Sequence, residues 1–330
     1  MQEFQEIVNK LNFDLKQIDK IILECAHGKS PLIEEISHHL IKSGGKRIRP
    51  ILLLISGKLC NLENDQRIYN LASAVELIHS ATLLHDDVVD NSQVRRGKKT
   101  ASALWDNKFS ILVGDYLFAT AFDLMVKSNS LKALELLSKT SAIIVDGEVM
   151  QLENSSDLSI TIDKYFEIIF CKTAVLFSAS CEVAGVIGEV KDFELLALKN
   201  FGKNLGIVFQ IVDDILDYSS NQKNLGKEIG NDFFEGKVTL PMIYTFQNAN
   251  NVEKEFIKKK FAENLQNKEK NHQDFMQILD LINKYNAIQH CKDMAFEYCD
   301  NAQQDLLIFE DSPYYQDLTD ILNYSLERIS

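Results

Sequence analysis

The stretch LLHDDVVDNSQVRRG, residues 83–97, places three aspartates inside an apolar run and then ends on two arginines and a glycine. The same Asp-Asp-x-x-Asp spacing returns in IVDDILDY, residues 211–218, again among isoleucine, valine and leucine. On a helix, side chains four positions apart share a face, so the first and third aspartates of each motif lie together. The two stretches therefore predict two helices that each carry a row of carboxylates.

Carboxylates in such a row repel one another. Like charges at this spacing cost a helix roughly 0.2–0.5 kcal/mol per pair, and more where water is excluded. A solvated acidic face would explain one motif, but apolar neighbours such as Leu84 and Ile215 indicate helices that are mostly buried. Carboxylate oxygens at this density suit a hard divalent cation, and Mg²⁺ completes its shell with water and phosphate oxygens. The candidate metal ligands are Asp86, Asp87, Asp90, Asp213, Asp214 and Asp217.

The composition of the whole chain favours an all-α fold. Of its 330 residues, 45% are hydrophobic, which is enough for a sizeable core, and only four prolines and 14 glycines interrupt the sequence. Apolar residues recur at three and four positions through most of the chain, which is the period of a helix. A strongly polar stretch, residues 248–273, keeps this spacing, so we expect a solvated helix pair there.

Charge and cysteine usage exclude several classes of protein. The formal net charge of −13 would repel a nucleic-acid backbone, so nucleic acid is not an expected partner. The first 17 residues, MQEFQEIVNKLNFDLKQ, lack the basic start and apolar run of a secretory signal, and we expect a cytoplasmic protein. Six cysteines without a Cys-x-x-Cys pair predict free thiols.

Basic residues are interleaved with the two acidic motifs. Arginine binds phosphate oxygens through its planar fork, and lysine binds them as a point charge. One basic cluster is common on protein surfaces, but several beside two aspartate rows indicate a diphosphate ligand. The segments GGKRIRP, QVRRGKK and GKEIGNDFFEGKVTLP supply Lys46, Arg49, Arg95, Arg96, Lys227 and Lys237.

The order of these motifs resembles the trans-prenyl diphosphate synthases, and within them the long-chain polyprenyl synthases of the octaprenyl type. The resemblance covers about residues 40–246 and rests on GGKRIRP, ELIHSATLLHDDVVDNSQVRRG, GDYLFATAF, GEVMQL, KTA, FQIVDDILDY and GKEIGNDFFEGKVTLP. It implies one all-α, isoprenoid-synthase-like domain over residues 1–330. That domain would be a helical bundle around a deep central cavity, with the two aspartate helices facing each other at its mouth. A homodimer is also implied.

The resemblance further implies an Mg²⁺-dependent condensation of an allylic diphosphate, for which we expect farnesyl diphosphate, with isopentenyl diphosphate. The allylic diphosphate would be bound through Mg²⁺ held chiefly by Asp86, Asp90 and Asp213. Other residues match family positions at the leaving diphosphate, in a metal-free isopentenyl pocket, and beside the allylic cation. The residues at the leaving diphosphate are Arg95, Lys172, Lys227 and Lys237, and those of the isopentenyl pocket are Lys46, Arg49, His79 and Arg96. Thr173 and Gln210 would lie beside the allylic cation and form the catalytic group together with Lys172.

Small residues near the first aspartate motif indicate a long product. Ala81 and Thr82 precede Asp86 by five and four positions, so they lie roughly 6–8 Å deeper along the helix. In short-chain relatives, a bulky aromatic residue near this depth blocks the growing tail. We therefore expect a product longer than C20, with C40 favoured and C35 and C45 left open. Such a product would be destined for the membrane as the side chain of a quinone.

Other functions remain possible on the sequence alone. A terpene cyclase also ionises an allylic diphosphate, but its second metal motif normally mixes Asn, Ser or Thr with Glu, and it lacks the isopentenyl pocket. A non-catalytic subunit of a heteromeric synthase would lose its aspartates, whereas this chain keeps all six. A shorter-chain geranylgeranyl synthase and a plain metal-binding helical protein are the remaining alternatives.

Overall fold

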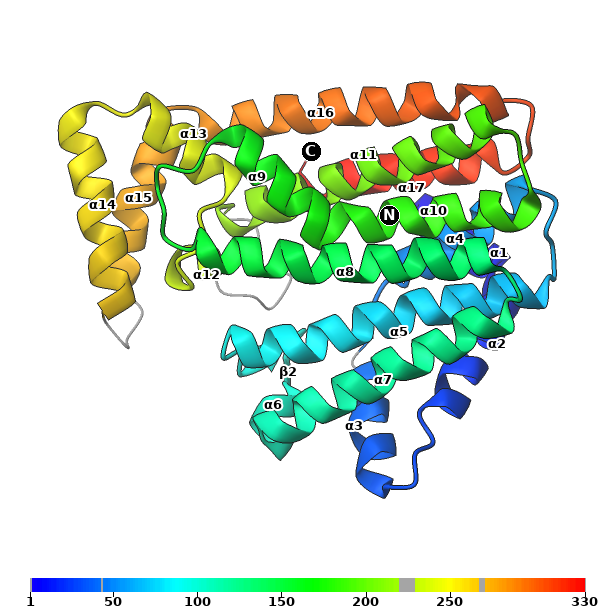
Figure 1. Cartoon of the computed structure of the whole chain (residues 1–330). Helices are drawn as coiled ribbons and strands as arrows, with labels where there is room; N and C mark the ends of the chain where they lie inside the picture. The colour runs from blue at the N-terminus through cyan, green and yellow to red at the C-terminus, as the bar shows by residue number, and fades with distance from the viewer. Residues whose placement is uncertain (1, 43, 220–228, 267–270, 330) are drawn as a thin grey trace. The chain divides into compact units, whose positions relative to one another are not determined.

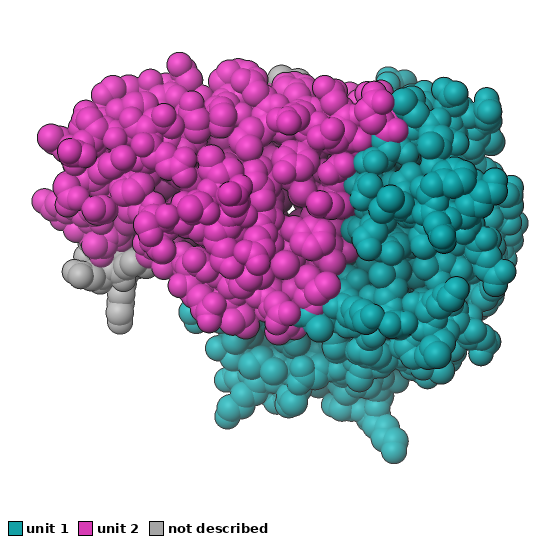
Figure 2. All heavy atoms as spheres, turned by 45° about the horizontal axis from the view of Figure 1, so that its top comes forward, with its two compact units in different colours: residues 1–142, 176–202, 305–321 teal, residues 143–175, 203–304, 322–330 magenta. Residues whose placement is uncertain are grey.

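The computed structural model describes residues 2–42, 44–219, 229–266 and 271–329, and within these residues it is almost entirely helical (Figure 1). The prediction of an all-α fold is confirmed. The chain divides into two compact units (Figure 2). The first contains residues 1–142, 176–202 and 305–321, and the second contains residues 143–175, 203–304 and 322–330. The single domain and its central cavity stay predictions, because each unit is described by itself.

The first unit contains the amino-terminal helices and one short hairpin. Its elements are α1 (Gln2–Lys10), α2 (Asn12–Cys25), α3 (Pro31–Lys42), α4 (Ile48–Leu59), α5 (Gln66–Val89), β1 (Val94–Arg95), β2 (Lys98–Lys99), α6 (Ala101–Trp105), α7 (Asn107–Lys127) and η3 (Leu307–Phe309). Five long helices contribute residues to both units. They are α8 (Leu131–Glu153), α10 (Val175–Gly188), α11 (Asp192–Asp217), α16 (Ala287–Leu306) and α17 (Tyr315–Glu327).

Helix α5 is the centre of the first unit. Asp65 begins it as an N-cap, accepting a hydrogen bond from the backbone N of Arg67 at 2.8 Å. Apolar residues such as Leu77 and Ile78 are fully buried, and α5 packs against α2, α4 and α7 (Figure 1). A helix that is buried on almost every face is exposed to solvent mainly at its ends. The first aspartate motif lies at such an end.

A two-residue turn follows α5 and shapes the arginine pair. Strands β1 and β2 pair antiparallel, with Arg95 opposite Lys98. The turn residues Arg96 and Gly97 both have positive φ, 52° and 75°, as a two-residue hairpin of the primed type requires. The short strands were not predicted, because two residues of each give no alternating pattern.

The second unit is built around aromatic side chains. It contains α9 (Ile162–Ile169), the π-helical turn η1 (Phe170–Ala174), α12 (Asn231–Phe234), α13 (Leu240–Asn248), α14 (Asn251–Gln266) and α15 (His272–Lys284). Phe233 is buried against Phe261 and Phe275, with ring centroids 5.1 and 5.9 Å away. Within the described part of the polar stretch, residues 248–273, the structure has one long helix, α14, and α15 begins only at its end, so a helix is found there but not the expected pair.

Among the residues that the structure describes, two helical stretches have the length and composition of a membrane span. One is Asn107–Lys127, which is only partly buried, and the other is Ile162–Gly188, of which 78% is buried in the protein. The second is typical of a core helix. The stretch Asn107–Lys127, which is α7, exposes large apolar side chains to solvent.

Candidate functional site

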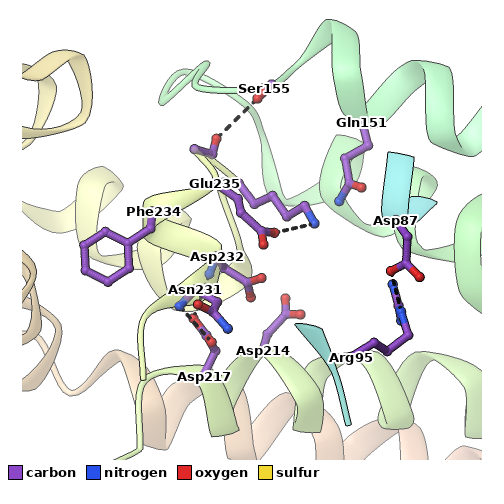
Figure 3. A network of polar contacts seen from close by, with 12 residues as sticks. Asp87, Arg95, Gln151, Ser155, Asp214, Asp217, Asn231, Asp232, Phe234 and Glu235 are labelled. Carbon is purple, nitrogen blue, oxygen red and sulfur yellow. Dashed lines mark hydrogen bonds and ion pairs between the residues drawn. The ribbon is translucent and has the colours of Figure 1, made fainter. Parts of the chain in front are cut away.

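The first aspartate motif lies in the last turn of α5. Asp86 and Asp87 belong to the helix, and Asp90 is its C-cap. Partial negative charge of the helix dipole gathers at this end, so carboxylates here are unfavourable without a cation. Asp87 is buried and accepts a hydrogen bond from Nε of Arg95 at 2.7 Å (Figure 3). Burial raises the pKa of Asp87, and Arg95 opposes this rise. Asp86 and Asp90 are half-buried.

Helix α7 fixes the orientation of α5 beside this motif. Nε2 of His85 lies 3.2 Å from the carbonyl oxygen of Ile111 and 3.3 Å from Oδ1 of Asp115. A Cβ on Gly114 would lie 2.4 Å from the same Nε2, so glycine is required for this approach. His85 therefore anchors α5 to α7.

A second cluster in the first unit gathers positive charge. Arg49 lies with its guanidinium carbon 4.4 Å from the centre of the Phe177 ring. Burial, opposed by the charge of Glu76 and reinforced by that of Arg96, lowers the pKa of Arg49 to about 10. Burial and neighbouring arginines, led by Arg49 and Arg96, also hold the pKa of His79 well below its usual value. The structure thus brings Arg49, His79 and Arg96 together as a basic cluster, at three of the positions expected to form the isopentenyl pocket.

Lys46 lies at the edge of this cluster. It follows Gly45, whose added Cβ would lie 2.7 Å from Nη1 of Arg96, and its side chain is exposed. Sequence reasoning missed two neighbours, Arg47 and Glu76, which form an ion pair at 2.8 Å. Arg47 lies inside the quoted GGKRIRP motif, but the sequence does not show that its side chain reaches Glu76 and Asp19.

The second aspartate motif lies in the last turn of α11. Asp214 is buried and accepts hydrogen bonds from the hydroxyl of Tyr165 at 2.7 Å and from Nε2 of Gln210 at 2.8 Å. Asp217 is also buried, and its carboxylate accepts hydrogen bonds from the backbone N of Asn231 and of Asp232. Asp217 thereby caps α12, as Figure 3 shows.

Asp213 is the most exposed aspartate of this motif. Its side chain is 44% exposed, and Nη2 of Arg328 donates to its Oδ1 at 3.0 Å. The Arg328 guanidinium carbon also lies 5.2 Å from the centre of the Phe209 ring. Sequence reasoning missed Arg328, because it lies in the last 80 residues, where the family motifs give no signal.

Asp232 is a further acidic residue that sequence reasoning missed. Figure 3 places it beside Asp214 and Asp217. Burial and the charge of Asp217 raise the pKa of Asp232, and burial and the charge of Asp232 raise that of Asp214. Its signal was present, since Asp232 lies inside the quoted segment GKEIGNDFFEGKVTLP. The second motif therefore gathers four carboxylates rather than three.

The catalytic group predicted around Lys172 lies on the π-helical turn. Lys172 is paired with Glu148 and donates to Oε1 of Gln151, both on α8. The hydroxyl of Thr173 donates to Oε1 of Gln210 at 2.9 Å. A Cβ on Gly147 would lie 2.5 Å from the backbone N of Lys172, so α8 approaches the turn closely only at a glycine. A π-helical turn commonly marks a functional position in a helix.

The remaining predicted residues fall in three places. Lys237 is paired with Glu235 at 2.8 Å, and Lys227 lies outside the described residues. Ala81 is fully buried, and the Thr82 hydroxyl donates to the carbonyl oxygen of His79 at 2.9 Å.

In the part of the chain that the structure describes, no three His, Cys, Asp or Glu side chains form a ready-made metal site. All six cysteines are free.

The helical architecture, the two carboxylate clusters at helix ends and the basic cluster are the features expected of a class of protein that binds diphosphates through metal and basic side chains. The polyprenyl synthetase family model matches residues 30–282. The chain therefore belongs to the polyprenyl synthetase family, whose members act on allylic and isopentenyl diphosphates and generally depend on a divalent metal. It is a trans-prenyl diphosphate synthase of the long-chain type, a prenyltransferase.

Relatives match over nearly the full length. The chain is 36% identical to the all-trans-nonaprenyl-diphosphate synthase (geranyl-diphosphate specific) of Rhodobacter capsulatus, covering 98% of each chain. It is 34% identical to the octaprenyl diphosphate synthase of Escherichia coli, again over 98% of each chain. It is also 37% identical to the geranylgeranyl diphosphate synthase of Saccharolobus solfataricus, over 92% of this chain and 90% of the relative.

Two solved structures share the fold. The structure of a decaprenyl diphosphate synthase from Rhodobacter capsulatus superposes with a TM-score of 0.93 at 39% identity, covering 99% of both chains. A polyprenyl synthase from Caulobacter crescentus, complexed with calcium and isoprenyl diphosphate, gives a TM-score of 0.92 at 39% identity. The latter covers 99% of this chain and 98% of the solved one.

Proposed function

We propose that the protein condenses an allylic diphosphate with successive isopentenyl diphosphates, in the presence of Mg²⁺, to an all-trans octaprenyl diphosphate. One observation carries the proposal. The chain holds two carboxylate clusters at the C-terminal ends of α5 and α11, and it also holds a basic cluster of Arg49, His79 and Arg96. Two diphosphates must be held at once in this reaction. The carboxylate clusters would bind the allylic diphosphate through metal, and the basic cluster would bind isopentenyl diphosphate without metal, so the two diphosphates would occupy different sites.

The donor set fits Mg²⁺. Asp86, Asp90 and Asp213 are half-buried carboxylates at helix C-termini, and hard oxygen donors of this kind suit the ion, which takes few protein ligands. When bound, Mg²⁺ supplies positive charge to the leaving diphosphate. Asp87, Asp214 and Asp217 would support the ligands, since each is buried and accepts hydrogen bonds from the protein.

The protein's own side chains then account for the remaining steps. Arg95, Lys172, Lys227 and Lys237 bind the leaving diphosphate while the allylic carbon–oxygen bond breaks. The oxygens of Thr173 and Gln210 face the allylic cation, which the double bond of isopentenyl diphosphate attacks to form the new carbon–carbon bond. The proton that is lost passes to the departed diphosphate. The lengthened product keeps the diphosphate of isopentenyl diphosphate, bound by Lys46, Arg49, His79 and Arg96.

A product-length assay tests the proposal. The protein is incubated with farnesyl diphosphate, radiolabelled isopentenyl diphosphate and Mg²⁺, and the dephosphorylated products are sized. A ladder that ends near C40 is expected. A ladder that stops at C20 would favour a geranylgeranyl synthase, and a cyclic hydrocarbon would favour a terpene cyclase. Absence of product from the protein alone, with activity restored by a second subunit, would favour a non-catalytic role.

Three further properties belong to the proposal. We propose a homodimer, because α7 exposes large apolar side chains, Ile111, Leu112 and Val126 among them, which water does not solvate well. We propose a cytoplasmic location, with the product passing to the membrane as the side chain of a quinone. Cell fractionation, together with the tail length of the extracted quinone, tests the last two.

A further inference from the structure

Arg47 occupies a strained position at the start of α4. It is the N-cap of the helix, with a left-handed backbone φ of 51°, which is unfavourable for a residue with a Cβ. Its guanidinium bridges two other helices. Nη1 donates to Oε1 of Glu76 on α5 at 2.8 Å, and Nη2 donates to Oδ1 of Asp19 on α2 at 3.2 Å. The two bonds hold the turn in this conformation.

Glu76 is the stronger of the two anchors. The Glu76 side chain is 11% exposed, whereas that of Asp19 is 53% exposed. A buried ion pair is screened less by salt and water than an exposed one. Burial raises the pKa of Glu76, and the charges of Arg47, Arg49 and Arg96 lower it. The carboxylate therefore interacts with the cations of the basic cluster as well as with Arg47.

The turn that Arg47 holds carries two residues expected in the isopentenyl pocket. Lys46 precedes Arg47, and Arg49 follows it in the first turn of α4. Nε of Arg49 is buried and has no hydrogen-bond partner among the described residues. This N–H donor therefore makes no hydrogen bond within the described protein. Glu76 also precedes His79 by three positions on α5, and the two therefore share a face of the helix. Through Arg47, Glu76 ties the α4 turn to the helix that carries His79.

We propose that Glu76 is a positioning residue for isopentenyl diphosphate. Its carboxylate holds Arg47, and the held turn presents Lys46 and Arg49 to the diphosphate beside His79. This inference rests on the proposed function. A simple counter-charge role would have the opposite sign, because removing a negative charge from a basic pocket strengthens anion binding. Loss of positioning weakens it instead.

The test measures binding of isopentenyl diphosphate by titration calorimetry in EDTA, with no metal and no allylic substrate. We expect Glu76→Ala to raise the dissociation constant about tenfold, the size of effect that supporting residues exert through a ligand-binding side chain. Glu76→Gln should fall between Glu76→Ala and the unmodified protein, since its amide oxygen still accepts the Arg47 bond. In steady-state assays the KM for isopentenyl diphosphate should rise while that for farnesyl diphosphate stays unchanged.

Glu182→Ala is the matched control. Glu182 is a half-buried acid of the same unit that is paired with Lys199 at 3.5 Å, and its loss should leave binding unaltered. If folded Glu76→Gln binds isopentenyl diphosphate as tightly as the unmodified protein, or more tightly, the inference is overturned. This result decides even where Glu76→Ala does not fold. A parent protein that elongates no allylic substrate would instead overturn the proposed function.

Discussion

The carboxylates of the two aspartate motifs differ in how deeply they are buried. Asp87 is paired with Arg95, and Asp214 accepts two side-chain hydrogen bonds. Asp86 and Asp213 are half-buried, whereas the adjacent Asp87 and Asp214 are buried. Burial with satisfied hydrogen bonds makes a carboxylate part of the protein's framework, whereas partial exposure leaves room for an ion and its water.

The first prediction concerns the half-buried pair. Asp86→Ala and Asp213→Ala should each lower turnover by roughly 10²–10³-fold or more, because each removes charge stabilisation from the leaving diphosphate. Asp123→Ala, an exposed α7 residue paired with Lys127, is the control. Turnover is measured with farnesyl and isopentenyl diphosphates, and circular dichroism checks the fold. Near-normal turnover in a folded double variant would refute the metal assignment.

His79 should make stability depend on pH. Its pKa in the folded protein lies well below the usual 6.5, so below about pH 6.5 only the unfolded chain takes up this proton. The free energy of unfolding therefore falls as pH falls, by about 1.4 kcal/mol per pH unit while the folded histidine stays neutral. His79→Gln should remove this part of the slope. Denaturant unfolding from pH 7.5 to 5 measures it, and equal slopes in both proteins would contradict the assignment.

At the level of elements, the contact between α5 and α7 depends on a glycine. Gly114→Ala places a Cβ 2.4 Å from Nε2 of His85, so either the ring or α7 must move. We expect a loss of about 1–3 kcal/mol in the free energy of unfolding, together with reduced turnover, because His85 adjoins Asp86. Ala119→Ser on the exposed face of α7 is the control. Unaltered stability would mean that the ring moves at no cost.

The size of the α5 side chains that lie deeper along the helix than the aspartates should set product length. Ala81 is fully buried and lies about 7 Å along the helix from Asp86. Ala81→Phe should shorten the product to about C20 or below, because the ring would occupy the path of the tail along this helix. Thr82→Ser, which keeps a small hydroxyl side chain, should leave the length unchanged. Product sizing decides, and a full-length ladder from Ala81→Phe would place the tail elsewhere.

For the whole molecule, the apolar surface of α7 bears on assembly. Leu112 is 62% exposed, and a charge there should prevent association if two copies bury this face. Leu112→Glu is expected to give a monomer by light scattering coupled to size exclusion, where the parent protein gives a dimer. Val252→Glu, at a position on α14 that is more exposed still, at 81%, should stay dimeric. A dimeric Leu112→Glu would move the interface to another surface.

Much of the fold could be read from local patterns. The helical period predicted α5, α7 and a helix in the polar stretch, where α14 lies, because each buries apolar residues at regular intervals. The β1–β2 hairpin and the π-helical turn η1 were missed, since neither leaves a periodic pattern. Asp232 lay inside a quoted motif and was passed over, because burial among other acids is a property of packing and not of spacing.

The sequence alone determined the helical class, the family and the identity of the acidic and basic residues, because those follow from composition, period and motif order. Only the tertiary structure decided the state of each side chain. It showed that Arg47 turns to Glu76, that Arg328 reaches Asp213 across 115 positions, and that Asp217 caps α12. Contacts between residues far apart in the chain depend on how helices pack, and no local pattern of residues encodes them.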